Sequence, residues 1–458
     1  MNTLIVPELR ELIASGDYDT LREFLADEHP AVIAEMISAL HKDEVWAVLQ
    51  YAEVDIRSEI YSHLDETLQV QIVKTLRRDE IVKLLTHMSP DDRADLFKHM
   101  PEELGESILP AMAHVEREDI RRLSSYEEGT AGAVMTSDYA TLPPGLTAQQ
   151  AIDHLRQVAP NKETIYYSYV IDEYRHILGF VSLKDLIVSH KDSLIDDIMN
   201  AEVITARVGD DQEDAARKIQ KLDLIALPVL NEQDALVGII THDDAIDIIT
   251  QEHTEDMEKF MAISGSHEDA VYMKMTILNH FRNRAPWVVV LAIFGLFSGF
   301  IVQNFEGLLM QFAILSVFMP MLAGTGGNTG SQSATLVVRA LALKEICARD
   351  TIRILSKELG IAFLLATLLG LLAYGRVIFF GAGSYIPPQY GLSQIAMAIS
   401  IALGLQVISS TLIGALLPLG ASRFKLDPAL VAIPALTTIV DITGLVIYFT
   451  TVKLLLNI

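Results

Sequence analysis

The sequence has almost no cysteine and comparatively few basic residues. Among its 458 residues Cys347 is the single cysteine, which excludes an intramolecular disulfide framework. Only 35 Lys and Arg stand against 60 Asp and Glu, so nucleic acid is a poor partner for this chain. The first thirty residues also lack a basic stretch followed by an apolar one, so we expect the N-terminal part to start in the cytosol.

Charge is distributed very unevenly along the chain. Residues 285–458 contain nine basic and six acidic residues, a net charge of +3, whereas residues 1–284 carry a net charge of −28. Half of all residues are hydrophobic and the mean hydropathy is +0.31, which excludes a disordered chain. An acidic part therefore precedes an apolar part.

Long uncharged runs in the apolar part predict five transmembrane helices, because about 20 apolar residues cross a bilayer as a helix. The runs lie near 285–305, 310–340, 358–380, 391–420 and 428–453. With the N-terminus inside, nine Lys and Arg residues face the cytoplasm and two lie outside, as the positive-inside rule favours. We expect a multi-pass protein of the cell (inner) membrane with cytoplasmic N-terminal domains and an external C-terminus.

The acidic part contains two kinds of module. Residues 1–130 have few glycines and short amphipathic segments, which predict a superhelix of short helices. Residues 131–256 contain two copies of a helix, strand, turn, strand and helix pattern, about 60 residues apart. Residues 257–283 form a predicted connecting helix, and residues 284–458 the transmembrane domain.

The internal repeat resembles a tandem pair of CBS domains, which bind regulatory ligands and usually perform no chemistry. That family often holds a nucleotide ribose with a Ser/Thr-x-x-Asp pattern, present here as Ser182-x-x-Asp185 and Thr241-x-x-Asp244. The same pattern is also an ordinary helix N-cap, so both interpretations stay open. The resemblance makes ATP a candidate ligand.

Two polar features interrupt the apolar part. The glycine-rich string 324–335 would expose backbone groups to lipid, so we expect it to line a water-filled path or a close helix crossing. Asp441 lies near the middle of the last apolar run, where a carboxylate costs about 3 kcal/mol or more unless it is paired or hydrated. Its partner is then a cation or a proton, and a protonated side chain bonded to a neighbouring helix is the alternative. The candidate pore residues are Gly326, Gly327, Asn328, Thr437 and Asp441.

The ligand chemistry on offer favours a hard cation. Oxygen donors surround these positions in sequence, with no Cys or His, which selects Mg²⁺, Ca²⁺ or Mn²⁺ over softer metals. Acidic residues also gather in the cytosolic part, where Asp91 and Asp95 share a helix face. Like charges this dense repel unless divalent cations neutralise them, although any single one of these residues could belong to a solvated acidic face.

Three segments are similar to the MgtE family of magnesium channels: the 324–335 string, the Leu426-Asp-Pro428 turn and the 440–448 segment. The resemblance implies a homodimer with the pore on its two-fold axis, Asp441 of each subunit at the ion site, and Mg²⁺ between the N and CBS domains holding the channel closed. The acids on the family's sensor positions are Asp91, Asp95, Asp211, Glu213, Asp223, Asp244, Asp247, Glu252, Glu255 and Asp256. Ile433 replaces a polar Asn of some relatives, and Leu224 an aromatic residue that would stack on a nucleotide.

The predicted fold class is a multidomain membrane protein with an all-α superhelical N-terminal domain, α/β tandem CBS domains, a long connecting helix and five transmembrane helices. The expected function is a Mg²⁺-selective channel for magnesium uptake, closed by cytosolic Mg²⁺. A carrier that couples a divalent metal to H⁺ or Na⁺ and a membrane Mg²⁺ sensor without transport are the alternatives. An enzyme is not expected, because the sequence shows no nucleophile–base pair and no metal site with His ligands.

Overall fold

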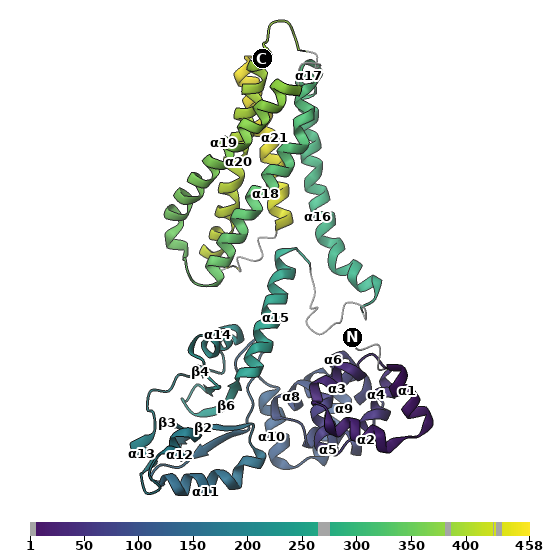
Figure 1. Ribbon diagram of the computed structural model, residues 1–458, viewed down its shortest axis with the longest axis vertical. Helices are drawn as coiled ribbons and strands as arrows, with labels where there is room; N and C mark the ends of the chain where they lie inside the picture. Colours follow the sequence, from purple (N-terminus) through teal and green to yellow (C-terminus); the bar gives the residue numbers. More distant parts are fainter. Residues whose placement is uncertain (1–5, 264–274, 381–385, 425, 427–432) are drawn as a thin grey trace. The chain divides into compact units, whose positions relative to one another are not determined.

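The computed structural model describes residues 6–263, 275–380, 386–424, 426 and 433–458 (Figure 1). The chain divides near residue 253 into two compact units, and each is considered by itself. Pro428 and Asp427 of the predicted turn lie outside the described residues, as does the start of the fifth predicted span.

The N-terminal domain is a superhelix of short helices, as the sequence predicts. Each helix from α3 to α8 packs against the helix two places further along the chain. Proline at the first turn of α3 and α8, and the side chains of Asp17 and Asp65 before α2 and α6, start helices in the expected way. The helices are α1 Val6–Ser15, α2 Tyr18–Asp27, α3 Pro30–Ile37, α4 Lys42–Leu49, α5 Val54–Ser62, α6 Glu66–Val73, α7 Arg78–Thr86, α8 Pro90–His99, α9 Glu102–Ile108 and α10 His114–Leu123, with the 3₁₀ turn η2 Leu109–Ala111.

The repeat forms two three-stranded sheets, ordered β1-β2-β3 and β4-β5-β6, each with one parallel and one antiparallel pair. Gly179 and Gly238 occupy matching positions, and a side chain on either would collide with the segment that leads into the other domain, at Asn200 and Thr136 respectively. The elements are β1 Tyr139–Leu142, α11 Ala148–Val158, η3 Ala159–Asn161, β2 Thr164–Ile171, β3 Ile177–Ser182, α12 Leu183–Val188, α13 Ile195–Ile198, β4 Ala206–Arg207, α14 Gln212–Leu222, β5 Ala226–Leu230, β6 Leu236–Thr241 and α15 His242–Phe260.

The predicted single connecting helix over residues 257–283 is wrong in its extent. Helix α15 begins inside the second CBS domain and ends at Phe260. Ala262 adopts a left-handed conformation with φ of 57°, and the amide of Ile263 bonds back to the carbonyl of Glu258. This is a Schellman C-cap, which stops a helix by satisfying its last carbonyl groups. The predicted kink at residues 264–266 lies outside the described residues.

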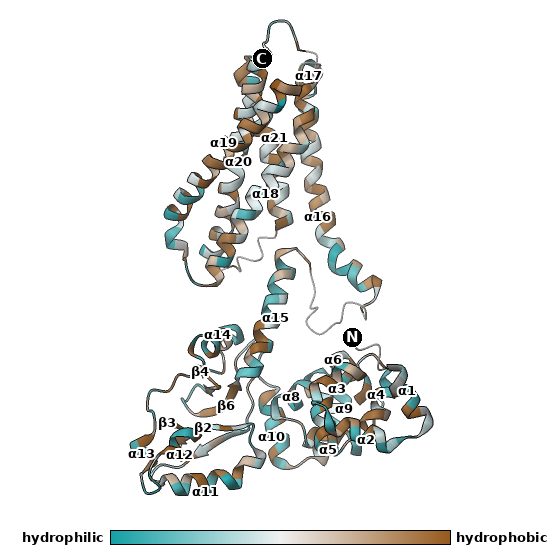
Figure 2. Ribbon diagram, viewed as in Figure 1, coloured by the Kyte–Doolittle hydropathy of each residue, from teal (hydrophilic) through white to brown (hydrophobic). Residues whose placement is uncertain are grey.

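Five long helices make up the apolar part, and Figure 2 shows the hydrophobic character of most of their length. Four of them, α16, α19, α20 and α21, are long and apolar enough to cross a membrane. Helix α18 has 29 residues and carries the polar glycine string, which lowers its hydropathy. Helix α20 packs against α18, α19 and α21 and thus forms the centre of this unit. The elements are α16 Ile277–Asn304, α17 Glu306–Gln311, α18 Ile314–Ala342, η4 Ala348–Asp350, α19 Thr351–Phe380, α20 Leu392–Arg423 and α21 Ile433–Leu456.

Candidate cation sites

Carboxylates from three separate segments converge where the N-terminal helices meet the second CBS domain. Asp91 and Asp92 lie in the first turn of α8, and Asp243 and Asp244 in the first turn of α15. Glu163 lies directly before β2. Ala94 of α8 belongs to the same hydrophobic cluster as the buried Ala245 and Ile248 of α15. We call these five acids the α8–α15 cluster.

Burial and neighbouring carboxylates raise the pKa values of three acids in the α8–α15 cluster. Burial raises the pKa of Asp91 well above its usual range, and the neighbouring charges of Asp92, Asp244 and Glu163 raise it further. Burial and the charges of Asp244 and Asp243 raise the pKa of Glu163 to about 7. Burial raises the pKa of Asp244 to about 6, although hydrogen bonds from Thr241 act in the opposite direction. Ionised at neutral pH, these groups repel one another.

Asp91 is the member of the α8–α15 cluster with the least satisfied carboxylate. Its Oδ1 atom is shielded from solvent and has no hydrogen-bond partner within the described part of the chain. A buried acceptor of this kind is costly unless something satisfies it. Among the described residues no three acidic, His or Cys side chains lie close enough to enclose an ion. The donor set therefore suits Mg²⁺, which binds through one or two carboxylates and keeps several waters.

The other predicted sensor acids have local partners of their own. Asp211 caps α14 by accepting the amide of Glu213 at 2.8 Å, and Asp223 ends the same helix in a left-handed conformation. Glu213 pairs with Arg217. Asp211, Glu213 and Asp223 therefore have structural roles within α14 and at its two ends.

Acids on α8 and α15 outside the cluster behave in the same way. Asp95 pairs with Lys98 at 3.5 Å, and Glu255 with Lys259 at 2.8 Å. Glu252 accepts a hydrogen bond from the side chain of Gln212 at 2.7 Å. Asp247 is exposed on α15, and Asp256 lies further along the same helix. Of all the predicted sensor acids, Asp91 and Asp244 are the pair that the structure joins in the α8–α15 cluster.

Sequence reasoning missed two members of the cluster, whereas Asp243 belongs to the acid-rich cytosolic segments that the sequence already indicated. Asp92 is the immediate neighbour of the predicted Asp91, so an acidic pair at a helix start could have indicated it. Glu163 stands alone between Lys162 and Thr164, and only the tertiary fold brings it near α8 and α15.

The Ser182-x-x-Asp185 pattern caps helix α12 in this structure. The hydroxyl of Ser182 accepts the amide of Asp185 at 3.0 Å and donates to its carboxylate at 2.5 Å. Thr241 donates to Asp244 in the same manner. A cavity of about 190 Å³ lies between the two CBS domains and has an aromatic wall from Tyr167, Tyr169 and Phe180, with Leu224 also lining it.

The glycine string of α18 forms a close helix crossing. A side chain at Gly326 would collide with the amide of Gln406 on α20, and one at Gly414 with the backbone of Gly330. Ser410 donates a hydrogen bond to the carbonyl of Gly326 and lies 3.0 Å from the hydroxyl of Thr329. Polar side chains thus replace lipid around the backbone that the glycines expose.

The other predicted pore residues lie beside this crossing. Gly327 faces Thr437 of α21, whose hydroxyl donates to the carbonyl of Pro434 at 2.9 Å. Asn328 is exposed, and Asp441 on α21 is half-buried. The structure therefore brings Gly327 of α18 into contact with Thr437 of α21. Asn328 lies on α18 and Asp441 on α21.

Gln406 is an unusual residue within the crossing. Its side chain is 1% exposed, and neither its Nε2 nor its Oε1 has a hydrogen-bond partner among the described residues. It lies against Gly326 of α18 and Gly444 of α21, where any side chain would collide with it. Asp441 lies on the same helix, three residues before Gly444.

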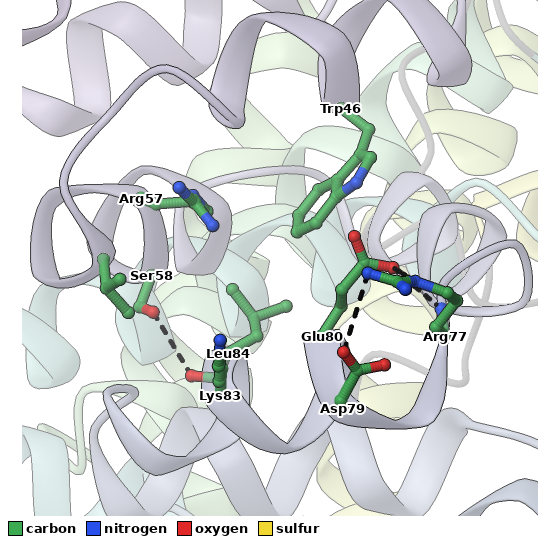
Figure 3. A pocket seen from close by; sticks show the side chains of 9 residues that line it. Trp46, Arg57, Ser58, Arg77, Asp79, Glu80, Lys83 and Leu84 are labelled. Carbon is green, nitrogen blue, oxygen red and sulfur yellow. Dashed lines mark hydrogen bonds and ion pairs between the residues drawn. The ribbon is translucent and has the colours of Figure 1, made fainter.

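A separate cavity of about 170 Å³ lies in the N-terminal domain, and Figure 3 shows Trp46, Arg57 and the Arg77, Asp79 and Glu80 group around it. Arg77 pairs with Glu80 at 3.3 Å and with Asp79 at 3.6 Å. The two acids that line this cavity already face a guanidinium, so it does not offer the unpaired carboxylates that a divalent cation requires.

Three family models match most of the chain. The MgtE divalent cation transporter model covers residues 319–451, the MgtE intracellular N domain model residues 28–129, and the CBS domain model residues 131–190 and 195–251. Magnesium transporter MgtE of Thermus thermophilus is 36% identical over 460 residues, which covers all of both chains. Magnesium transporter MgtE of Bacillus subtilis is 34% identical over 342 residues, 74% of this chain and 73% of that one.

Solved structures match the cytosolic part. The cytosolic domain of the Mg²⁺ channel MgtE in complex with ATP is 34% identical, with a TM-score of 0.50, and covers 52% of this chain and 98% of that one. The soluble part of a magnesium transporter is 31% identical, with a TM-score of 0.51, and covers 55% of this chain and 99% of that one. The order of the domains, the apolar helices and the full-length identity lead to one conclusion: this chain is a membrane protein of the MgtE family of magnesium transporters, and not an enzyme.

Proposed function

We propose that the protein is a Mg²⁺-selective channel for magnesium uptake, and that Mg²⁺ bound between the N-terminal and CBS domains closes it. The observation that carries this proposal is the solvent-shielded, unpaired carboxylate oxygen of Asp91 beside Asp244. A cation between them would join α8 to the first turn of α15. The relative described as a Mg²⁺ channel supports conduction by this fold.

The gating step follows from charge. Without a cation the α8–α15 cluster repels itself, so its two helices gain free energy by separating. Mg²⁺ supplies positive charge there and favours the docked arrangement, in which Ala94 packs with Ala245 and Ile248. A ligand shifts such an equilibrium only by its preference for one state. Moving it from 1:99 to 99:1 takes about 5.5 kcal/mol, which several weakly held ions supply jointly.

The ion site of the channel is proposed at Asp441. One carboxylate per chain near the middle of the membrane suits a hydrated Mg²⁺ shared by two subunits, so we propose a homodimer with both Asp441 side chains on its axis. Thr437, one turn earlier on α21, adds a hydroxyl near Gly327. The C-terminus lies outside in this arrangement, because five spans separate it from the cytosolic domains.

ATP is the proposed ligand of the cavity between the CBS domains. Tyr167, Tyr169 and Phe180 supply an aromatic wall for a base. Neither Ser182 nor Asp185 lines this cavity, and the Asp185 carboxylate accepts the hydroxyl of Ser182. The related cytosolic domain was solved with ATP, which supports the assignment.

Single-channel recording in planar bilayers tests the function directly. Stepping the cytosolic Mg²⁺ concentration should close the wild-type channel steeply, and the Asp91→Asn, Asp244→Asn double variant should stay open at high Mg²⁺. Saturable flux that requires H⁺ or Na⁺ would favour a coupled carrier instead. Absence of any Mg²⁺ flux in liposomes that contain folded protein would leave a sensor without transport.

A further inference from the structure

A second cavity in the first CBS domain has the opposite chemistry to the rest of the cytosolic part. It measures about 210 Å³ and lies beside β1 and α11. Apart from one valine its walls are polar, and none of the residues that line it is acidic. They are the hydroxyl residues Ser137, Tyr139 and Thr141 and the basic residues His154, Lys162 and Arg175. Three basic side chains around one cavity are unexpected in a chain with 60 acidic and 35 basic residues.

Arg175 is held in place toward this cavity by contacts on several sides. Its guanidinium lies over the ring of Tyr139, 5.8 Å from the ring centre, and donates to the Tyr139 hydroxyl. Its Nε also donates to the carbonyl of Leu236 at 3.2 Å. The backbone of Arg175 is left-handed, with φ of 68°, a conformation uncommon for a residue that is not glycine. An arginine fixed in this way loses little freedom when it binds an oxyanion.

Lys162 has a weak partner that an anion can replace. Its Nζ lies 3.4 Å from Asp138, and both side chains are partly exposed. Ion pairs of this kind contribute little to stability, whereas hydrogen bonds between a cation and a phosphate oxygen are short and strong. The imidazole of His154 and the hydroxyl of Thr141 add donors without adding negative charge, whereas the hydroxyls of Ser137 and Tyr139 already donate to Asp119 at 3.2 Å and to the carbonyl of Leu236 at 3.0 Å.

We propose that this cavity binds a phosphate-type oxyanion, held by Arg175 and Lys162 with donors from His154 and Thr141. It is lined by a different set of residues from the aromatic cavity between the CBS domains and from the α8–α15 cluster. The shared chemistry is a phosphate group, which free phosphate or the phosphate tail of a nucleotide can supply.

Calorimetric titration of the full-length protein in detergent tests this site. Inorganic phosphate and ATP are titrated separately in Mg²⁺-free buffer at constant ionic strength. Lys162→Met should weaken binding about tenfold or more, the loss expected for a charge-assisted hydrogen bond. The matched control is Lys184→Met, which removes an exposed lysine of the same domain from α12 and should bind as the wild type does. His154→Gln is a second variant, chosen in case Lys162→Met folds poorly.

The two ligands identify the source of the phosphate group. Phosphate binding that depends on Lys162 assigns the site to free phosphate, and Lys162-dependent binding of ATP alone assigns it to a nucleotide tail. Either result supports the site. The proposal is overturned if neither ligand binds at up to about 10 mM, where affinity is already weaker than about −3 kcal/mol, or if the Lys162, His154 and Lys184 variants all bind equally.

An anion bound in this cavity should also strengthen Mg²⁺ binding at the α8–α15 cluster. This expectation rests on the proposed function. The amide of Glu163 bonds the carbonyl of Asp138 at 2.9 Å, and the Asp138 charge acts on the Glu163 carboxylate. When Lys162 turns from Asp138 to the anion, the α8–α15 cluster gains negative charge beside it. Coupling between two sites is typically 5-fold to 150-fold, so the Mg²⁺ needed for compaction should fall at least about fivefold.

Limited proteolysis of the full-length protein measures that compaction, with sulfate as the anion because it stays soluble with Mg²⁺. A sulfate-dependent shift in the wild type that is absent in Lys162→Met supports the coupling. If sulfate leaves the Mg²⁺ concentration for half-maximal protection unchanged in the wild type, the coupling between the two sites is overturned. If Mg²⁺ gives no protection with or without sulfate, the proposed gating fails, while the calorimetric result for the anion site stands independently.

Discussion

The side-chain amide of Gln406 on α20 occupies the space that any side chain at Gly326 of α18 would need. Gly444 of α21 leaves the other part of that space free. Helices α18, α20 and α21 therefore meet at one buried amide. Gly326 and Gly444 both leave room for the side chain of Gln406. The glycine string is explained here by close packing around polar side chains.

Gly326→Ala should destabilise the transport domain, because the added methyl group must displace Gln406. Overpacking of this kind typically costs about 1–3 kcal/mol. We expect a lower thermal unfolding temperature in detergent together with reduced Mg²⁺ flux in liposomes. Gly324→Ala is the matched control, since a methyl group there meets open space. Equal stability of the two variants would show that Gln406 moves aside without cost.

Local patterns in the sequence predicted most of the fold. The apolar runs predicted the long helices, and first-turn prolines such as Pro90 predicted where helices begin. The internal repeat predicted the paired sheets, in which Gly179 and Gly238 occupy matching positions. The end of α15 was missed because it depends on a left-handed Ala262, and alanine carries no sequence preference for that conformation.

The candidate site was predicted less completely, for a physical reason. A helix face explains why Asp91 and Asp95 were paired, but Asp95 turns to Lys98 while Asp91 faces Asp244 and Glu163. Glu163 lies 72 positions and Asp244 lies 153 positions after Asp91 in the sequence, and contacts over such separations leave no periodic pattern. Gln406 was missed likewise, because an unpaired buried amide is recognised only from its surroundings.

Asp441→Asn should abolish Mg²⁺ flux and leave the protein folded, because the amide keeps the shape of the side chain but cannot neutralise a divalent cation. Flux of Mg²⁺ into liposomes with an internal fluorescent indicator measures the loss. Glu306→Gln removes an exposed acid at the start of α17 and should transport normally. Wild-type flux through a folded Asp441→Asn protein would remove Asp441 from the ion path.

Glu163→Gln should raise the Mg²⁺ concentration needed for channel closure, since one charge leaves the α8–α15 cluster while its other acids remain. We expect a shift of about threefold to tenfold, because a tenfold change corresponds to about 1.4 kcal/mol. Recording at stepped cytosolic Mg²⁺ gives the midpoint. Glu173→Gln, in the exposed turn between β2 and β3, is the matched control. Identical midpoints for both variants would exclude Glu163 from the cation site.

Acid pH should partly replace Mg²⁺ in docking α8 onto α15. Burial and like charges raise the pKa of Glu163 to about 7 and that of Asp244 to about 6. A raised carboxyl pKa means that the docked form binds more protons than the separated one, so docking gains stability as pH falls through 7 and then 6. The gain reaches at most about 1.4 kcal/mol per pH unit for each proton and levels off below the ordinary pKa values.

Limited proteolysis of the full-length protein without Mg²⁺ measures this effect between about pH 8 and pH 5, a range that brackets both groups. Protection of the α8–α15 region should increase toward acid pH in the wild type. The Glu163→Gln, Asp244→Asn double variant lacks both titrating carboxylates, so its protection should not change with pH in this range. Protection that instead falls on acidification of the wild type would show that its docking depends on ionised carboxylates, and the repulsion argument would then be wrong.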